Sequence, residues 1–138
     1  MLDLSSLSPG QQTIATQIAS AFAKAAYGTP QQAAAVANAI AESSLNPMAV
    51  SATAEEHSVG LFQVNMKDGL GKGFTETQLQ DPGTNISIII AECQRHPALA
   101  TATDVAVANQ IFVAQIERPA NVSEETARRL AIAQALMT

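Results

Sequence analysis

The sequence predicts a mainly α-helical domain with a small loop or β-ribbon region in its middle. Hydrophobic residues make up 47 % of the 138 residues, enough for a core, whereas aromatic residues make up only 4 %. Abundant alanine with few aromatic residues favours close-packed helices over a β-sandwich, because strands prefer β-branched and aromatic side chains. Apolar residues also recur at helical spacing on both sides of a glycine-rich stretch, residues 46–83. We expect one domain, residues 1–138.

Two helices are expected before the glycine-rich stretch. Ser8 is a candidate N-cap with a proline at the first helical position, and Gly28 is expected to end this helix. Thr29 is the candidate cap of the second helix, which is again followed by a proline. The second helix is expected to stop at Asn46-Pro47, because the residue before a proline is pushed out of helical geometry.

The stretch 46–83 is expected to hold no long helix, because glycines interrupt it repeatedly. A loop or short β-ribbon is expected around residues 59–64, followed by a short helix over residues 75–80.

Three longer helices are expected in the C-terminal part. Thr84 or Asn85 is the expected cap of a strongly apolar helix that runs to about Arg95. Asp104 is expected to cap a helix over residues 105–117. Ser123 with Thr126 is expected to lead into a last helix that reaches the C-terminus.

Composition argues against several classes of function. The formal net charge is −5, so the chain lacks the positive charge that dominates nucleic-acid binding. One cysteine and two histidines make a zinc site improbable, and no metal or cofactor is expected. The most apolar run, residues 86–91, is far too short to span a bilayer, and no secretory signal is predicted at the N-terminus.

Two short motifs carry the chemistry. The first places Glu42-Ser43 at the end of an alanine-rich helix, and the second is Gly60-Leu61-Phe62-Gln63-Val64-Asn65. Glycoside cleavage needs a carboxylic acid that is still protonated near neutral pH. A carboxyl group at the end of an apolar helix is partly shielded from water, which favours its protonated form. In the second motif, amide side chains alternate with apolar ones, and amides suit the hydroxyl and N-acetyl groups of a sugar.

This pair of motifs resembles the lysozyme superfamily, most closely its lytic transglycosylase branch and the small wall-lytic domains of phages. The resemblance implies a lysozyme-like α+β fold and cleavage of peptidoglycan between N-acetylmuramic acid and N-acetylglucosamine. It implies that Glu42 is the catalytic acid and that five further residues bind substrate. These are Ser43, Ser58, Gly60, Gln63 and Asn65. A later segment, Ile116-Glu117-Arg118-Pro119, resembles the end of a helix in the phage versions.

The chain departs from the animal-type lysozymes at one position. Those enzymes resemble this chain but carry an aspartate two residues before the motif glycine, where Ser58 stands here. Glu55 and Glu56 lie nearby and are candidates for the missing second carboxylate. A single-glutamate enzyme is the simpler interpretation, and the resemblance then implies a 1,6-anhydro product made without a second carboxylate. A muramidase that hydrolyses the same bond is the alternative.

The resemblance to phage domains also predicts a location. We expect a virion-associated protein with peptidoglycan and other tail proteins as partners, acting at the host periplasm or cell wall during phage entry. Bacterial cell wall is polyanionic, so the net charge of −5 indicates that something other than electrostatic attraction delivers the chain. An endolysin in the host cytoplasm before lysis is the alternative location. A structural phage component with a lysozyme fold and little or no activity is the alternative function.

Overall fold

The structure, a computed structural model, describes residues 1–137. Its helices are α1 (Pro9–Lys24), α2 (Thr29–Ser43), α3 (Glu76–Leu79), α4 (Pro82–Cys93), α5 (Pro97–Thr101), α6 (Val105–Ile111), the π-helical segment η1 (Phe112–Glu117) and α7 (Val122–Leu136). Its strands are β1 (Val50–Ala52), β2 (His57–Val59) and β3 (Val64–Asn65). None of the helices within residues 1–137 combines the length and the apolar character needed to cross a membrane.

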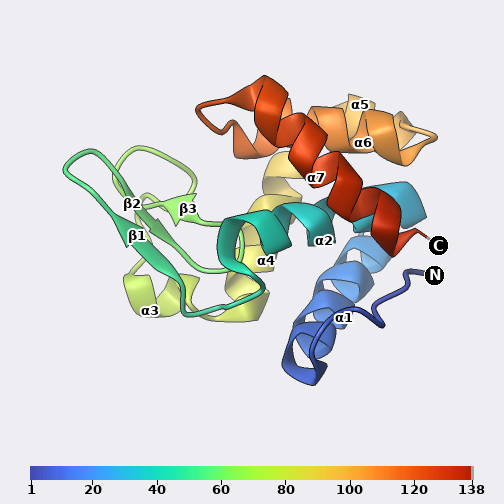
Figure 1. Ribbon diagram of the computed structural model, residues 1–138. Coiled ribbons are helices and arrows are strands. Elements are labelled where there is room, and N and C mark those ends of the chain that lie inside the picture. The colour runs from blue at the N-terminus through green and yellow to red at the C-terminus, as the bar shows by residue number, and fades with distance from the viewer. Residues whose placement is uncertain (138) are drawn as a thin grey trace.

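The helices form one body around α2, and the strands lie to one side of it (Figure 1). α2 packs against α1, α6 and α7. The alanines of α2 allow this close approach, because five of them are buried and present only a methyl group to their neighbours: Ala33, Ala34, Ala35, Ala37 and Ala39. The predicted mainly α fold with a small β region is confirmed, and it is consistent with a lysozyme-like α+β fold.

The strands form an antiparallel sheet in the order β1-β2-β3. Val50 pairs with Val59 across the first ladder, and Val59 pairs with Val64 across the second. The expected ribbon around residues 59–64 is therefore present, but the sheet begins earlier in the chain, at β1. β1 is exposed along its length, so it has no alternation of buried and exposed side chains by which the sequence could mark it as a strand.

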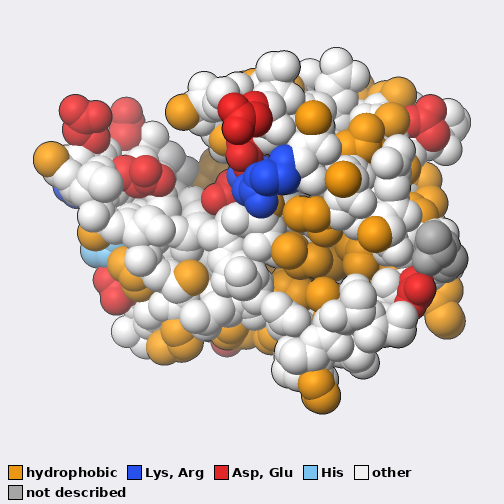
Figure 2. Space-filling view, in the orientation of Figure 1, with side chains coloured by type: hydrophobic (Ala, Val, Ile, Leu, Met, Phe, Trp, Pro, Cys, Tyr) orange, Lys and Arg blue, Asp and Glu red, His pale blue; other side chains and the backbone are white. Residues whose placement is uncertain are grey.

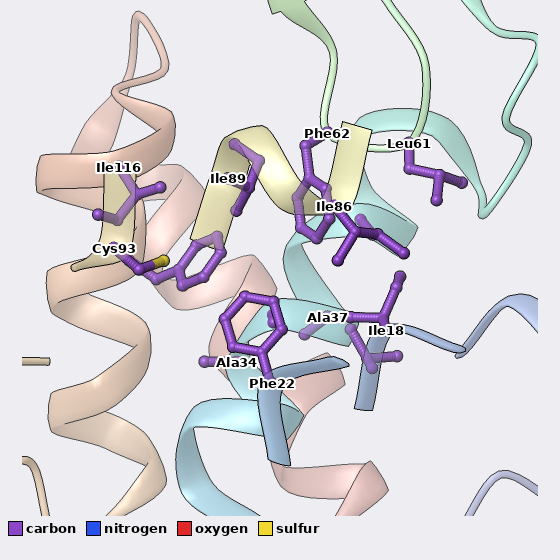
Figure 3. Close-up of a cluster of buried hydrophobic side chains, with 14 of the residues drawn as sticks. Ile18, Phe22, Ala34, Ala37, Leu61, Phe62, Ile86, Ile89, Cys93 and Ile116 are labelled. Atoms are coloured by element: carbon purple, nitrogen blue, oxygen red, sulfur yellow. The ribbon is translucent and has the colours of Figure 1, made fainter. Parts of the chain in front are cut away.

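Aromatic rings link the helices to the loop that follows β2. The Phe112 ring centroid lies 6.3 Å from that of Phe22 and 6.1 Å from that of Phe62. Figure 3 shows Phe62 beside Ile86 and Ile89 of α4. Each of these side chains is buried, so the loop carrying the second motif is anchored in the same core as α1 and α4.

Asn85 of α4 holds this loop by hydrogen bonds. Its amide oxygen accepts from the backbone N–H of Phe62 at 3.0 Å, and its amide nitrogen donates to the carbonyl oxygens of Val59 and Leu79, each at 3.0 Å. Asn85 was expected as a helix cap, and this expectation is wrong: the cap is Asp81, whose carboxylate accepts from the N–H of Thr84. Asn85 lies inside the helix and is fully buried.

Of the other predicted N-caps, two are present in the structure and two are replaced by other residues. Ser8 and Asp104 cap α1 and α6 as expected, each by accepting a backbone N–H. Thr29 does not cap α2, because the helix already begins at this residue and Gly28 occupies the cap position. Ser123 does not cap α7, because the Asn121 side chain two residues earlier accepts the N–H of Glu124.

The helices differ from expectation in three further ways. α2 ends at Ser43, before Asn46-Pro47, because Ser44 turns into the left-handed region at φ 55°. The expected helix over residues 105–117 is present, but its last part, Phe112–Glu117, is π-helical. The short helix α5 was not expected.

Candidate active site

Glu42 lies in the last turn of α2, facing α7. The carbonyl end of a helix carries partial negative charge, which is an unfavourable place for a carboxylate unless a cation is near. Arg129 of α7 supplies that cation, with its Nη1 atom 3.0 Å from Glu42 Oε2. The Glu42 side chain is 20 % exposed and the Arg129 side chain 4 %, so this ion pair is largely shielded from water.

Arg129 is held from three sides. Its Nη1 atom also donates to Asn38 Oδ1 at 2.9 Å, and its Nε atom donates to Glu125 Oε1 at 2.9 Å. Asn38 is fully buried and in turn donates to Asn109 of α6. The guanidinium position is therefore set by α2, α6 and α7 together, and Glu42 is paired with a cation that cannot move freely.

A second carboxyl group, from Glu117 at the end of η1, meets Glu42. Burial, then the charge of Glu42 and the hydrogen bond to it, raise the pKa of Glu117 well above its ordinary value, while the charge of Arg129 acts in the opposite direction. The structure therefore places a carboxyl group with a raised pKa beside the predicted catalytic glutamate.

A polar cavity of about 260 Å³ opens between the sheet region and η1. Glu117 lines it, and so do four of the residues predicted from the sequence. These four are Glu56, Ser58, Gln63 and Asn65. Figure 2 shows an indentation between the strands and α7, with acidic side chains on both sides of it.

Ser58 and Glu56 form one unit on the wall of this cavity. Ser58 is buried, and its hydroxyl donates to Glu56 Oε2. Glu55 is exposed in the turn between β1 and β2, where its N–H donates to Thr53 Oγ1, and it does not line the cavity. The structure therefore separates the two candidates for a second carboxylate, since only Glu56 reaches the cavity.

The amide side chains of the second motif hold its backbone as well as line the cavity. Gln63 Nε2 donates to the carbonyl oxygens of Ala49 and Gly60 at 3.1 and 3.0 Å. Asn65 Oδ1 accepts from the N–H groups of His57 and Lys67. Their predicted contacts with substrate stay a prediction, but the positions are compatible with it.

Gly60 is required by packing inside the protein. Its φ of +84° favours glycine, and a Cβ atom there would collide with the amide of Asn85 and the carbonyl of Leu79. Gly60 does not line the cavity. Its closest neighbours are protein atoms of α3 and α4, and the predicted contact of Gly60 with substrate stays a prediction.

Ser43 joins the end of α2 to the same loop. Its hydroxyl donates to the carbonyl oxygen of Leu61 at 2.8 Å and of Ala39 at 3.0 Å. We expect Ser43→Ala to lower the free energy of unfolding by about 1 kcal/mol, because the Leu61 carbonyl loses its partner. Urea unfolding of the two proteins would measure this. A fall in catalytic rate with unchanged stability would instead support the predicted contact of Ser43 with substrate.

Sequence reasoning missed two residues of this cluster. These are Glu117, which the sequence marks only as part of a resembling helix end, and Arg129, which no motif marks. Arg129 shares the buried face of α7 with Ala133 and Leu136, at helical spacing. An arginine at a buried helical position needs an anionic partner, so this pattern was an available signal.

The raised pKa of Glu117 predicts a pH dependence of stability. The folded protein holds this proton to higher pH than the unfolded chain does, so stability is fully present below the ordinary pKa of 4.5 and falls as pH rises toward the folded pKa. We expect the free energy of unfolding to decline from pH 5 upward, and the decline to be smaller in Glu117→Gln. Urea titrations of both proteins at several pH values would test this. Equal slopes in the two proteins would contradict it.

Within the described residues, no group of three His, Cys, Asp or Glu side chains is placed to hold a metal ion. Cys93 is buried in α4, as expected of a core residue, and burial raises the pKa of its thiol to about 12.

The mainly helical α+β fold is consistent with a lysozyme-like fold, and a carboxyl group with a raised pKa lines its polar cavity. The family model described as phage tail lysozyme matches residues 13–138. The chain therefore belongs to the phage tail lysozyme family. Membership indicates a glycosidase that acts on peptidoglycan and a place in a phage tail, which confirms the resemblance to phage lysozyme-like domains. Searches of curated proteins and of solved structures found no match.

Proposed function

We propose that this chain cuts the glycan strand between N-acetylmuramic acid and N-acetylglucosamine, with Glu42 as the catalytic acid. The observation that carries the proposal is the setting of Glu42: it is largely shielded from water in an ion pair with Arg129, and its charge raises the pKa of Glu117, which lines the polar cavity. Cleavage of a glycosidic bond begins when a carboxylic acid protonates the departing oxygen. The walls of that cavity carry amides and a hydroxyl, which suit the polar groups of a sugar.

We propose the lytic transglycosylase type of cleavage. In this reaction the C6 hydroxyl of the muramic acid replaces water and closes onto C1, so no second carboxylate is needed to activate water. Ser58 stands where the animal-type lysozymes carry their aspartate. A muramidase is the second candidate, and the Glu56 carboxylate on the cavity wall is the observation that favours it.

We propose that the protein is a component of the virion, where it contacts other tail proteins, and that it opens the cell wall during phage entry. Family membership supports the tail location. The net charge of −5 supports delivery by a particle, because free diffusion to a polyanionic wall would be opposed by charge. Immunodetection of the chain in purified virions, against a lysate of infected cells, would distinguish this location from that of a cytoplasmic endolysin.

The type of cleavage is read from the fragments that the purified protein releases from bacterial peptidoglycan. Fragments lighter by one water than hydrolysis products are expected by mass spectrometry, and they would establish the transglycosylase. Ordinary reducing-end fragments would establish the muramidase and turn attention to Glu56. A folded protein that releases no fragments from walls of the proper host would contradict the proposal and favour a structural tail component with little or no activity.

A further inference from the structure

We propose that Arg118 binds a carboxylate carried by the muramic acid of the substrate, and that it thereby makes the cavity specific for strands that contain muramic acid. This inference rests on the proposed function, because it concerns the substrate of the same cavity. It names the side chain that distinguishes peptidoglycan from a strand of N-acetylglucosamine alone. Binding measurements can test it without any cleavage.

Arg118 is the one cationic residue among the described residues that line the polar cavity. Three carboxyl groups line the same cavity, from Glu56, Asp68 and Glu117. Within residues 1–137, the guanidinium of Arg118 nevertheless takes part in no ion pair and no hydrogen bond. Its N–H donors are therefore available to a ligand. A carboxylate is the group that a guanidinium binds best, through two parallel hydrogen bonds.

The other arginines of the chain already have anionic partners. Arg95 lies 3.8 Å from Glu92, and Arg128 and Arg129 are both bound to Glu125. These three arginines are also absent from the described lining of the cavity. Arg118 differs from them in both respects, since it lines the cavity and has no partner of its own.

The backbone fixes Arg118 at the mouth of the cavity, where the residue is exposed. Arg118 directly follows η1 at φ 49° and ψ 56°, and its N–H donates to the carbonyl oxygen of Val113 at 2.8 Å. Glycine is the usual residue at such a helix end, because a side chain is unfavourable in the left-handed region. Gln63, at φ 50°, shares this conformation and lines the same cavity. Non-glycine residues in this conformation cluster at binding sites, which agrees with a functional role of the Arg118 side chain.

The distribution of charge in the cavity orients an acidic sugar. Muramic acid differs from N-acetylglucosamine by a lactyl group, whose carboxylate is free in a bare strand and joined to a peptide in the intact wall. The carboxyl groups of Glu56 and Asp68 repel an anion from the sheet side of the cavity, whereas Arg118 attracts it to the side of η1. Glu117, whose pKa the charge of Glu42 raises, directly precedes Arg118. A muramic acid bound by Arg118 therefore lies on the wall of the cavity nearest to Glu42.

Binding of soluble tetrasaccharides to the Glu42→Gln variant tests the proposal, because this variant is expected to leave them uncut. Three probes are compared by NMR titration: the tetrasaccharide of N-acetylglucosamine, the bare tetrasaccharide that alternates it with N-acetylmuramic acid, and the latter with its peptides attached. Adding Arg118→Gln should weaken the binding of a muramic acid probe about threefold to tenfold, and less at high salt. Binding of the N-acetylglucosamine probe should not change, because that sugar has no carboxylate.

The three probes also identify the carboxylate. A loss confined to the bare muramic acid probe assigns Arg118 to the lactyl carboxylate, and a loss confined to the peptide-bearing probe assigns it to the peptide. A loss with both supports either carboxylate as the ligand. Equal losses with all three probes, or no loss with either muramic acid probe, would overturn the proposal. Arg95→Gln is the matched control, since it removes the same charge from an exposed arginine outside the cavity lining.

Arg118→Gly separates a role in binding from a role in the fold. Glycine suits a φ of 49°, so the urea midpoint should equal or exceed that of the wild type, while binding of the muramic acid probe weakens as in Arg118→Gln. A lower midpoint with unchanged binding would assign Arg118 to the fold and overturn the proposal. Binding that depends on Arg118 in a protein that releases no fragments would defeat the proposed cleavage alone. Cleavage by a protein whose binding is indifferent to Arg118→Gln would defeat this inference alone.

Discussion

Glu42→Gln is expected to abolish the release of peptidoglycan fragments while leaving the fold intact. An amide cannot donate an acidic proton to the departing oxygen, and general acid catalysis contributes about 10²–10⁴-fold to such rates. The amide oxygen can still accept from Arg129, and Arg129 keeps its bonds to Asn38 and Glu125. The rate of fragment release by the two proteins, at equal concentration and at the optimum pH of the wild type, measures the effect.

The control for Glu42→Gln is Glu124→Gln, an isosteric change of an exposed glutamate away from the cavity lining. Far-UV circular dichroism and a cooperative thermal transition would establish that both variants are folded. Fragment release by Glu42→Gln within a few-fold of the wild type would contradict the assignment of the acid. Glu117, whose pKa is raised by burial and by the charge of Glu42 and which lines the cavity, would then be the next candidate for the proton donor.

Asn85→Ala is expected to cause the largest loss of stability among the polar substitutions considered for this protein. The change removes three buried hydrogen bonds and leaves the N–H of Phe62 and the carbonyls of Val59 and Leu79 without partners. Each buried group left unsatisfied costs about 1–3 kcal/mol, so a loss of about 3 kcal/mol or more is expected from urea unfolding. The loop that carries Gln63 should become mobile at the same time.

Ser87→Ala is the matched control for Asn85→Ala, since Ser87 lies on the exposed side of the same helix. It should change the free energy of unfolding by less than about 0.5 kcal/mol. Hydrogen exchange of the amides at residues 59–63 would show whether the loop opens in Asn85→Ala. A loss below about 1 kcal/mol would mean that water replaces the amide at little cost, contrary to the expectation.

The helices that were predicted correctly are those whose sequence patterns involve residues only a few positions apart. Ser8 and Asp104 each cap the helix that follows them, because a cap needs only a side-chain oxygen and an N–H three residues later. Asn85 shows the limit of the same signal. The residue type suited a cap, but its amide was needed by backbone groups of the loop and of α3, and Asp81 capped the helix in its place.

No pattern in the sequence predicts that the segment Phe112–Glu117 is π-helical. Apolar residues along this segment fit an α-helix equally well, and the wider turn places Phe112 against Phe22 and Phe62 while Glu117 meets Glu42. π-helical turns are frequent at functional sites, which agrees with the position of Glu117 in the cavity. Only packing against α2 and α4 selects this geometry.

The sequence by itself determined the helical class of the fold, the end of α2 as the place of the acidic residue, and the glycine-rich loop opposite it. These features follow from periodicity, capping and residue type, which act over a few residues. The tertiary structure alone decided that Glu117 and Arg129 meet Glu42, and that Glu56 rather than Glu55 reaches the cavity. Those contacts join residues far apart in the chain, or depend on which way a turn faces, so they exist only once the helices and the sheet have packed.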